Sequence, residues 1–222
     1  MDKTNEKYNA YIQILKEELI PAMGCTEPIA LAYAAAVARK VLGQLPERVD
    51  IGASGSIIKN VKSVIVPNTD HLKGIPAAAT AGIIAGDPDK ELEVIASVTK
   101  EQVEEMKEFL KKTPISVEHV DNGLTFDIIV TLYKGDEYAK VRIANYHTNI
   151  VLIEKNGEIL EQTEVAGETE EGLTDRSLLN MKDICDFINT VDVEDIKPSL
   201  KRQIDYNWAI AETTEQTLVR FC

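Results

Sequence analysis

The spacing of hydrophobic positions changes along the chain and divides it into helical and β segments. Near the start, apolar residues recur every three or four positions, which predicts an amphipathic helix over residues 4–20. Pro21 and Gly24 end that pattern. A run of small apolar residues then predicts a closely packed helix over about 27–42, with Thr26 as its N-cap and Gly43 after its end.

Further helices and one strand are expected before residue 115. Residues 48–53 form a short strand candidate, and the Ala- and Ile-rich stretch 74–86 predicts a second closely packed helix. Thr99 and Gln102 have the spacing of a capping box, which places the start of another helix there, running to about Lys112. Residues 91–97 fit either a short helix or a strand.

From residue 115 to residue 160 the pattern alternates with a period of two, which is typical of β-strands. Asp121-Asn122-Gly123, Lys134-Gly135-Asp136 and Asn156-Gly157 carry the residue types of tight hairpin turns. The segment therefore predicts an antiparallel meander of four or five strands.

The last part of the chain is polar and then helical. Residues 161–176 are acidic and contain glycine, which is typical of a linker, and helices are predicted over 177–191 and about 198–221. We therefore expect an α+β fold, with an antiparallel sheet of four to five strands packed with Ala-rich helices. The expected organisation is an α+β domain over 1–160, an acidic linker over 161–176, and the start of a truncated helical domain over 177–222.

Composition excludes several classes of function. The chain of 222 residues has a net charge of −13, which argues against binding to nucleic acid or to an anionic membrane surface. Its longest apolar stretch, about 29–38, is too short to span a bilayer, and its start lacks an apolar signal core. Three widely spaced cysteines favour a reducing compartment over a disulfide framework, so we expect a cytoplasmic protein.

Cys25 is the first candidate for chemistry. It stands just before a predicted helix, where the positive end of the helix favours a thiolate, the form of cysteine that attacks electrophiles and binds metals. A buried, inert cysteine at a helix junction is the alternative, and the local sequence favours that alternative.

A second candidate is the stretch Ser54-Gly55-Ser56-Ile57-Ile58-Lys59-Asn60. Its small residues predict a turn whose backbone N–H groups could converge on an anion, with Lys59 adding a positive charge. Such turns are also common as plain connections, and the stretch alone does not decide between the two.

Three separated stretches together carry a resemblance to a known family. They are Gly24-Cys25-Thr26-Glu27-Pro28, Ser54 to Val61, and His147-Thr148-Asn149-Ile150 ahead of a Glu154-Lys155-Asn156-Gly157 turn. In this order they resemble the L-cysteine desulfidase family, which is related to the iron–sulfur-dependent L-serine dehydratases. The resemblance extends from about residue 10 to the end of the chain.

The resemblance implies a lyase that works without pyridoxal phosphate (PLP). Such enzymes use a 4Fe-4S cluster, held by three cysteines, as a Lewis acid, and they convert L-cysteine or L-serine to pyruvate, ammonia and sulfide or water. Cys25 matches the first cluster cysteine, and the other cluster cysteines of the family lie in a helical second half. The chain therefore looks like the N-terminal half of such an enzyme, either truncated or one partner of a split enzyme, and inactive without the other half.

The resemblance also implies roles for the other motif residues. His147 is the candidate base for the Cα proton, with Lys59 as its rival, and a structural histidine at a strand end is the alternative for His147. The substrate would be bound by small and polar side chains and one glycine: Ser54, Gly55, Ser56, Asn60, Thr148 and Asn149. His71 and His119 are interpreted as structural or solvent-facing. Cys185 is interpreted as core packing on an apolar helix face, and Cys222 as a terminal residue.

Three functions therefore compete: half of an elimination enzyme, a cluster-free module that binds a small amino acid, and a non-functional truncated product. The expected partners are a small amino-acid substrate and a second helical subunit or a further copy of the chain. A half-enzyme should expose a hydrophobic face around Cys25 and residues 177–221, whereas a self-sufficient binding module should not.

Overall fold

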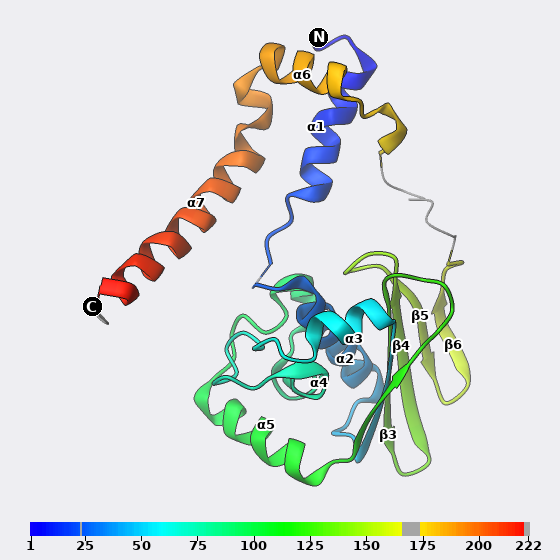
Figure 1. The fold of residues 1–222 in the computed structure, drawn as a ribbon. Coiled ribbons are helices and arrows are strands. Elements are labelled where there is room, and N and C mark those ends of the chain that lie inside the picture. Colours follow the sequence, from blue (N-terminus) through cyan, green and yellow to red (C-terminus); the bar gives the residue numbers. More distant parts are fainter. Residues whose placement is uncertain (23, 166–173, 220–222) are drawn as a thin grey trace. The chain divides into compact units, whose positions relative to one another are not determined.

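The structure is a computed structural model that describes residues 1–22, 24–165 and 174–219 (Figure 1). The chain forms two compact units. The larger unit is Ala22–Glu168, and the smaller one combines Met1–Pro21 with Thr169–Cys222. The expected domain over 1–160 therefore differs from these units in where the first 21 residues fall. Most of the expected linker, 166–173, lies outside the described residues.

A six-stranded sheet forms one layer of the larger unit. Its strand order is β2-β1-β3-β4-β5-β6, with every pair antiparallel except β1 and β2, which are parallel. The strands are β1 (Arg48–Ala53), β2 (Ile115–His119), β3 (Asp127–Lys134), β4 (Glu137–Ala144), β5 (Ile150–Lys155) and β6 (Glu158–Gln162).

The expected α+β class is confirmed, and the expected meander is confirmed for β3 to β6. Two details differ from the expectation. The sheet has six strands among the described residues instead of four to five, and β2 does not join the meander. It pairs with β1, on the far side of β1 from β3. A helix-containing connection from β1 to β2 makes this parallel pairing possible.

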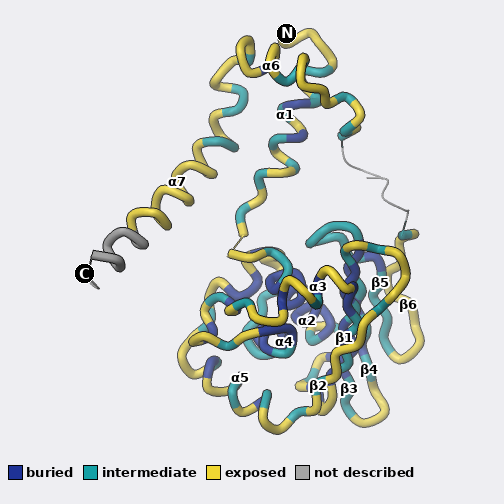
Figure 2. Tube along the Cα trace, viewed as in Figure 1, coloured by how far each residue is buried: buried dark blue, intermediate teal, exposed yellow. Residues whose placement is uncertain are grey.

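Two small-residue helices pack on one side of the sheet, the first directly against the strands and the second against the first helix (Figure 1). Helix α2 (Thr26–Leu42) packs against β3, β4 and helix α4 (Gly74–Ala85). The two helices approach closely because one contact position is glycine: a Cβ at Gly82 would lie 2.0 Å from the carbonyl oxygen of Ala32. Figure 2 shows that α2 and α4 are largely buried. The rest of this layer is α3 (Gly55–Val61), the 3₁₀ helix η1 (Pro88–Glu93) and α5 (Lys100–Lys112).

Alternate residues of the strands form the core with α2. Val49, Ile51 and Ala53 of β1 are buried, while the residues between them are only partly buried, as expected for a sheet covered on one face. The predicted capping box at Thr99 is confirmed: its hydroxyl accepts a hydrogen bond from the backbone N–H of Gln102, and the Gln102 side chain accepts from the N–H of Thr99.

The smaller unit is helical. It contains α1 (Glu6–Glu18), the 3₁₀ helix η2 (Arg176–Leu178), α6 (Met181–Thr190) and α7 (Val193–Val219). Tyr8, Tyr11, Ile14 and Phe187 form its core, in which both tyrosine rings meet the Phe187 ring edge-on at 5.5 and 5.3 Å between ring centroids. This core is separate from that of the sheet unit.

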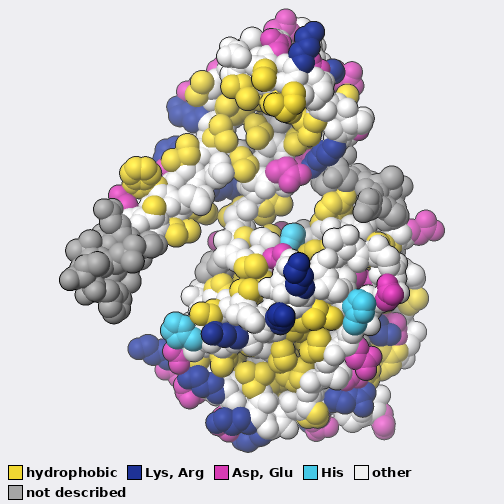
Figure 3. Space-filling view, viewed as in Figure 1, with side chains coloured by type: hydrophobic (Ala, Val, Ile, Leu, Met, Phe, Trp, Pro, Cys, Tyr) yellow, Lys and Arg dark blue, Asp and Glu magenta, His cyan; other side chains and the backbone are white. Residues whose placement is uncertain are grey.

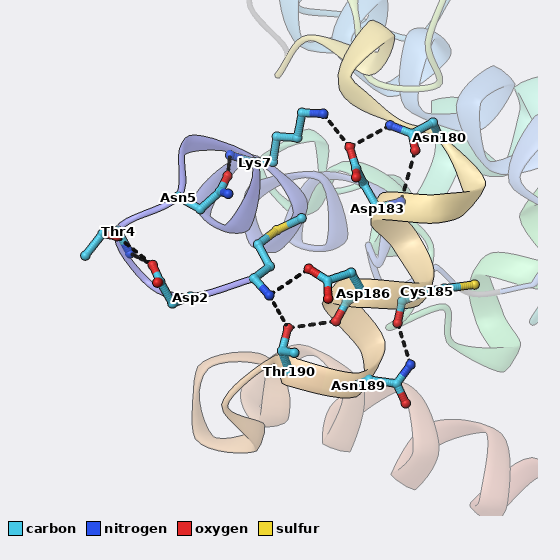
Figure 4. Close-up of polar contacts among 11 residues, drawn as sticks. Asp2, Thr4, Asn5, Lys7, Asn180, Asp183, Cys185, Asp186, Asn189 and Thr190 are labelled. Atoms are coloured by element: carbon cyan, nitrogen blue, oxygen red, sulfur yellow. Dashed lines mark hydrogen bonds and ion pairs between the residues drawn. The ribbon is translucent and has the colours of Figure 1, made fainter.

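Polar contacts tie the start of the chain to α6 (Figure 4). The N-terminal ammonium donates to the Asp186 carboxylate at 2.7 Å and to the Thr190 hydroxyl at 3.0 Å, and Lys7 pairs with Asp183. Farther along α1, the Glu17 carboxylate pairs with Arg176 and accepts a hydrogen bond from the Thr174 hydroxyl at 2.9 Å. These contacts, between residues 157 to 189 positions apart, explain why α1 belongs with η2 and α6.

The C-terminal helices differ from the sequence prediction in three ways. The helix predicted over 177–191 is divided into η2 and α6, and α6 begins only at Met181. Helix α7 begins at Val193, so Pro198 lies inside it and not at its start. Cys185 is exposed, which corrects its interpretation as a core residue. The physical reason is that α6 has apolar residues on two faces: Ile184 and Phe187 pack toward α1, whereas Cys185 lies on the other side with its sulfur pointing away from the N-terminal contacts (Figure 4).

Candidate functional site

Glu27 joins two of the three sequence motifs. Its Oε2 accepts a hydrogen bond from the Cys25 thiol at 3.0 Å, and its Oε1 accepts one from the Asn60 side-chain amide at 3.2 Å. Glu27 lies in the first turn of α2, and Asn60 lies near the end of α3. The start of α2 and the end of α3 are therefore held together by a single carboxylate.

His147 brings in the third motif from the loop between β4 and β5. Backbone hydrogen bonds shape this loop, and the Asn149 side chain closes it by donating to the carbonyl of Ala144 at 2.8 Å. The Phe126 ring packs edge-on against the imidazole, with 4.6 Å between ring centroids. Burial lowers the pKa of His147 below its usual value, and the negative charge of Glu27 opposes this effect in part. The imidazole is consequently neutral at pH 7 and able to accept a proton.

Cys25 differs electrostatically from the sequence expectation. Cys25 is exposed, yet desolvation by the surrounding protein raises the pKa of its thiol, and the hydrogen bond to the Glu27 carboxylate raises this pKa further. The same bond, together with that from Asn60, lowers the pKa of Glu27. The expected thiolate is therefore a thiol that donates to Glu27, because desolvation and the nearby carboxylate together outweigh the effect of the helix N-terminus. Cys25, and not Thr26, is also the N-cap residue, and its side chain makes no capping hydrogen bond.

The expected anion-binding turn at Ser54 is a helix start. Ser54 is the N-cap of α3, and its side chain is buried, with 2% of the residue exposed. Its hydroxyl donates to the carbonyl oxygen of Thr125 at 2.7 Å, and its N–H donates to that of Asp127 at 2.9 Å. Ser54 thus fixes α3 to the start of β3. Ser56 and Lys59 are exposed on α3, and Gly55 occupies its first position.

A buried ion pair supports the same region. Asp127 is fully buried, and its two carboxylate oxygens each accept a hydrogen bond from Arg142 at 2.9 Å. Asn122 donates to the same carboxylate. Such a bidentate pair satisfies a charge that would be costly to bury alone. The ion pair fixes the start of β3. Ser54 bonds to the backbone carbonyls of this segment, and Phe126, which contacts His147, belongs to it.

The structure thus bonds Cys25 and Asn60 to Glu27 and places His147 where the charge of Glu27 acts on it. The side chains of Ser54 and Asn149 are instead engaged by backbone carbonyls. Thr148 lies half-buried in the His147 loop. Two nearby residues were not predicted as part of the site. Glu27 was named only as part of the first motif, with no role of its own in the site, and its position two residues after Cys25 is the signal that could have identified it. The other is His119, whose Nε2 would lie 3.3 Å from a Cβ at Gly55.

The site offers a single cysteine thiol as a possible ligand for an iron–sulfur cluster. Among the residues that the structure describes, no group of three or more His, Cys, Asp or Glu side chains could hold a metal ion. Cys25 is the single cysteine of the sheet unit in the sequence. A cubane cluster is held by several cysteine thiolates, so the residues of this unit do not fit a complete 4Fe-4S cluster.

Comparisons with known proteins extend over nearly the whole chain. No family model matches it. The chain is 53% identical over 214 residues to a UPF0597 protein of Desulfitobacterium hafniense, and 45% and 44% identical to UPF0597 proteins of Treponema denticola and Lachnoclostridium phytofermentans. The chain is a homologue of the UPF0597 proteins.

The matches cover 95%, 96% and 92% of this chain but 49% of each UPF0597 protein. The chain therefore spans about half the length of the curated relatives it matches, which is consistent with a partial chain. The name of these relatives states no activity. Over the described residues, no helix has the length and apolar character that a membrane crossing requires.

Proposed function

We propose that the chain is the substrate-binding part of a PLP-independent lyase that acts on L-cysteine or L-serine. The observation that supports this proposal is that Glu27 is hydrogen-bonded to Cys25 and Asn60 while its charge acts on His147, because these residues come from three motifs that are far apart in the sequence. A purely structural role would not require a thiol, a neutral imidazole and an ionised carboxylate at one place.

His147 has the properties that a general base needs. Burial keeps its imidazole neutral near pH 7, and Phe126 and the closed loop hold the ring in one orientation. In the proposed reaction an imidazole nitrogen takes the Cα proton of L-cysteine, the C–S bond breaks, and sulfide leaves. The resulting aminoacrylate tautomerises and is hydrolysed to pyruvate and ammonia.

The exposed face of α3 suits the substrate carboxylate. Ser56 and Lys59 are exposed on this helix, one turn apart, and the Asn60 amide lies next to them on Glu27. Lys59 is assigned to binding, because His147 has the better environment for a base. The roles of Thr148 and Asn149 reduce to shaping the loop that carries His147.

The iron–sulfur cofactor belongs to this proposal only in part. A cluster, where present, would supply a Lewis acid for the leaving group. Cys25 offers one thiol ligand, and the described residues of the sheet unit offer no other. The remaining ligands would have to come from a polypeptide beyond this unit, so the steps above use only side chains of this chain.

Substitution of Cys25 tests the proposal. The chain is combined with a polypeptide equivalent to the unmatched part of the Desulfitobacterium hafniense relative, and sulfide release from L-cysteine is measured under anaerobic conditions after addition of iron and sulfide. We expect activity from the pair, its loss with Cys25→Ser, and its retention with Glu118→Gln, which changes an exposed residue of β2. Activity that survives Cys25→Ser would remove Cys25 from the site.

A cluster-free amino-acid-binding module is the second candidate. It is favoured by the protonated state of Cys25, since a thiol bonded to a carboxylate is a poor metal ligand. Titration calorimetry of the chain alone with L-cysteine and L-serine separates the two candidates. Binding that Cys25→Ser leaves unchanged, together with no sulfide release from the combined polypeptides, would favour the binding module.

A further inference from the structure

The C-terminal half of the smaller unit carries an apolar surface that its own core does not use. Large hydrophobic side chains on α6 and α7 are at least half exposed to solvent: Met181, Ile188, Val193, Ile204, Tyr206, Trp208 and Ile210. Figure 3 shows hydrophobic side chains along both helices. Monomeric soluble proteins seldom expose contiguous apolar patches of large area, and such patches commonly mark interaction sites.

The apolar positions of α7 form a stripe with helical spacing. Val193, Ile196, Leu200, Ile204 and Trp208 recur every three or four residues, so they lie along one side of the helix. The first part of the stripe has a partner, because Ile196 packs against the core of Tyr8, Tyr11, Ile14 and Phe187. The stripe continues beyond that core without cover.

Residues 201–212 of α7 are all exposed (Figure 2). Polar and apolar positions share this exposure: Arg202 donates a hydrogen bond to the carbonyl oxygen of Leu19 at 2.9 Å, whereas the apolar side chains of Ile204 and Trp208 are 60% and 64% exposed. Most helical stability in proteins comes from packing of an apolar face, not from the helix propensity of the residues. A helix segment that keeps an apolar stripe in this situation is built for contact with another polypeptide.

Helix α6 adds a second strip of the same kind. Met181, Cys185 and Ile188 are four and three residues apart and exposed, while Ile184 and Phe187 of the same helix face the core. The helix is thus apolar on two sides. One side packs in the core of the smaller unit, and the other is exposed. We call the exposed strip of α6 together with residues 204–210 of α7 the α6–α7 surface.

We propose that the α6–α7 surface binds the polypeptide that corresponds to the unmatched half of the UPF0597 proteins. The relatives supply the argument for this occupant, because the chain matches 92–96% of its own length but covers only 49% of each of them. A folded half of that size offers enough apolar surface to cover a helix stripe, which a small ligand does not. The proposal concerns association alone and does not depend on the proposed lyase chemistry.

The single tryptophan of the chain is a built-in reporter for this contact, because Trp208 lies within the surface and is 64% exposed. The chain is labelled with 5-fluorotryptophan and titrated with the unmatched half of the Desulfitobacterium hafniense relative, made as a separate polypeptide. Fluorine NMR of the chain and sedimentation velocity are recorded together. We expect a 1:1 complex and a shift of the single fluorine resonance as solvent leaves the indole.

Two substitutions locate the interface. Ile204→Glu on α7 and Met181→Glu on α6 should each weaken the complex by at least tenfold, since a carboxylate would be buried in an apolar contact. Both side chains are more than half exposed in the free chain, so circular dichroism should remain unchanged. Ile159→Glu is the matched control: Ile159 is a 53% exposed residue of β6 in the other unit, and its substitution should leave the affinity unchanged.

Three results would overturn the proposal. The first is no complex at concentrations where both polypeptides are folded. The second is a complex that Ile204→Glu and Met181→Glu leave intact. The third is self-association of the chain alone that Ile204→Glu abolishes, because the occupant would then be a second copy of this chain. Loss of lyase activity with the complex intact would contradict only the proposed function.

Discussion

At the scale of single residues, Glu27 decides the chemistry of the candidate site. One of its oxygens accepts from the Cys25 thiol and the other from Asn60, and its charge acts on His147. The sequence identified all three neighbours but not Glu27 itself. A carboxylate in a first helical turn is already explained by the helix dipole, so its second role becomes visible only when α3 and the β4–β5 loop are in place.

Replacing Glu27 should lower the pKa of the Cys25 thiol. Glu27→Gln removes the negative charge that stabilises the thiol form, so the pKa of Cys25 falls and more thiolate is present at pH 8. We expect alkylation of Cys25 by iodoacetamide to become roughly three- to tenfold faster, as one unit of pKa changes the thiolate fraction by up to about tenfold. Peptide mass spectrometry separates Cys25 from Cys185 and Cys222.

Glu118→Gln, which removes an exposed carboxylate of β2, is the control for that measurement. Its alkylation rate at Cys25 should match that of the unmodified chain. A rate that Glu27→Gln leaves unchanged or lowers would show that burial alone, and not Glu27, raises the pKa of Cys25.

His147 should make stability depend on pH in a defined direction. Burial lowers its pKa in the folded chain below the ordinary value of 6.5, so the unfolded chain binds more protons between these two pKa values. The free energy of unfolding should therefore decrease as the pH falls through 6.5 toward the folded-state pKa. His147→Gln should remove this part of the pH dependence.

Urea denaturation of both forms at several pH values between about 5 and 8 measures this difference. His71→Gln, at an exposed loop position, reports what removal of another histidine does to the same curve. The opposite result would be a wild-type free energy of unfolding that increases relative to that of His147→Gln as the pH falls. Burial would then not be what sets the pKa of His147.

At the scale of elements, local patterns predicted most helices and strands well, because period and capping are local properties. The small-residue helices, the capping box at Thr99 and the strand over 48–53 all follow from neighbouring residues. The parallel partner of β1 did not follow, since β2 lies more than 60 residues away and pairing across that distance leaves no local signature. The prediction of a turn at Ser54 was wrong for a similar reason. Ser54 begins helix α3, and the contact that fixes it there is a hydrogen bond to the carbonyl of Thr125, which is distant in the sequence.

The packing of α4 on α2 should be sensitive to one added methyl group. A Cβ at Gly82 would lie 2.0 Å from the carbonyl oxygen of Ala32, a backbone atom that cannot move aside. Gly82→Ala gains about 1 kcal/mol of helix propensity. Overpacking at this contact costs about 3 kcal/mol or more, so the steric effect wins and the chain is destabilised.

Chemical denaturation of Gly82→Ala measures that loss. Gly43→Ala is the matched control at the end of α2, where the backbone has φ +82° and no atom lies within 4 Å of an added Cβ. It should cost only about 1 kcal/mol, because it introduces backbone strain without a clash. Equal losses for the two variants would mean that the helices adjust their separation freely.

At the scale of the whole molecule, the two ends of the sequence belong to the same compact unit. Residues 1–21 form a unit with the C-terminal helices, although the sequence places them directly before the sheet unit. Patterns of hydrophobicity could predict α1 and α6 separately but not their partnership, because an amphipathic face does not specify which distant face it meets. The exposed stripes of α6 and α7 could not be predicted for the same reason. The sequence shows that these positions are apolar, but not that they are uncovered.

The two units have no core residue in common, so damage to one core should remain in its own unit. Phe187→Ala removes the ring that both Tyr8 and Tyr11 contact, and such a truncation costs about 3–5 kcal/mol. The core of the smaller unit is small, so this loss should open α1 and α6 locally. Hydrogen exchange followed by mass spectrometry should show faster exchange in both helices and unchanged exchange in β3 and β4.

Ile188→Ala provides the comparison, because Ile188 follows Phe187 on α6 but is 67% exposed and outside the core. Its removal should leave the exchange of both units unchanged. If Phe187→Ala instead accelerated exchange equally in α1, β3 and β4, the two cores would belong to one cooperative unit. Retained protection in β3 and β4 would mean that the sheet unit keeps Cys25, Glu27 and His147 in place without help from the helical unit.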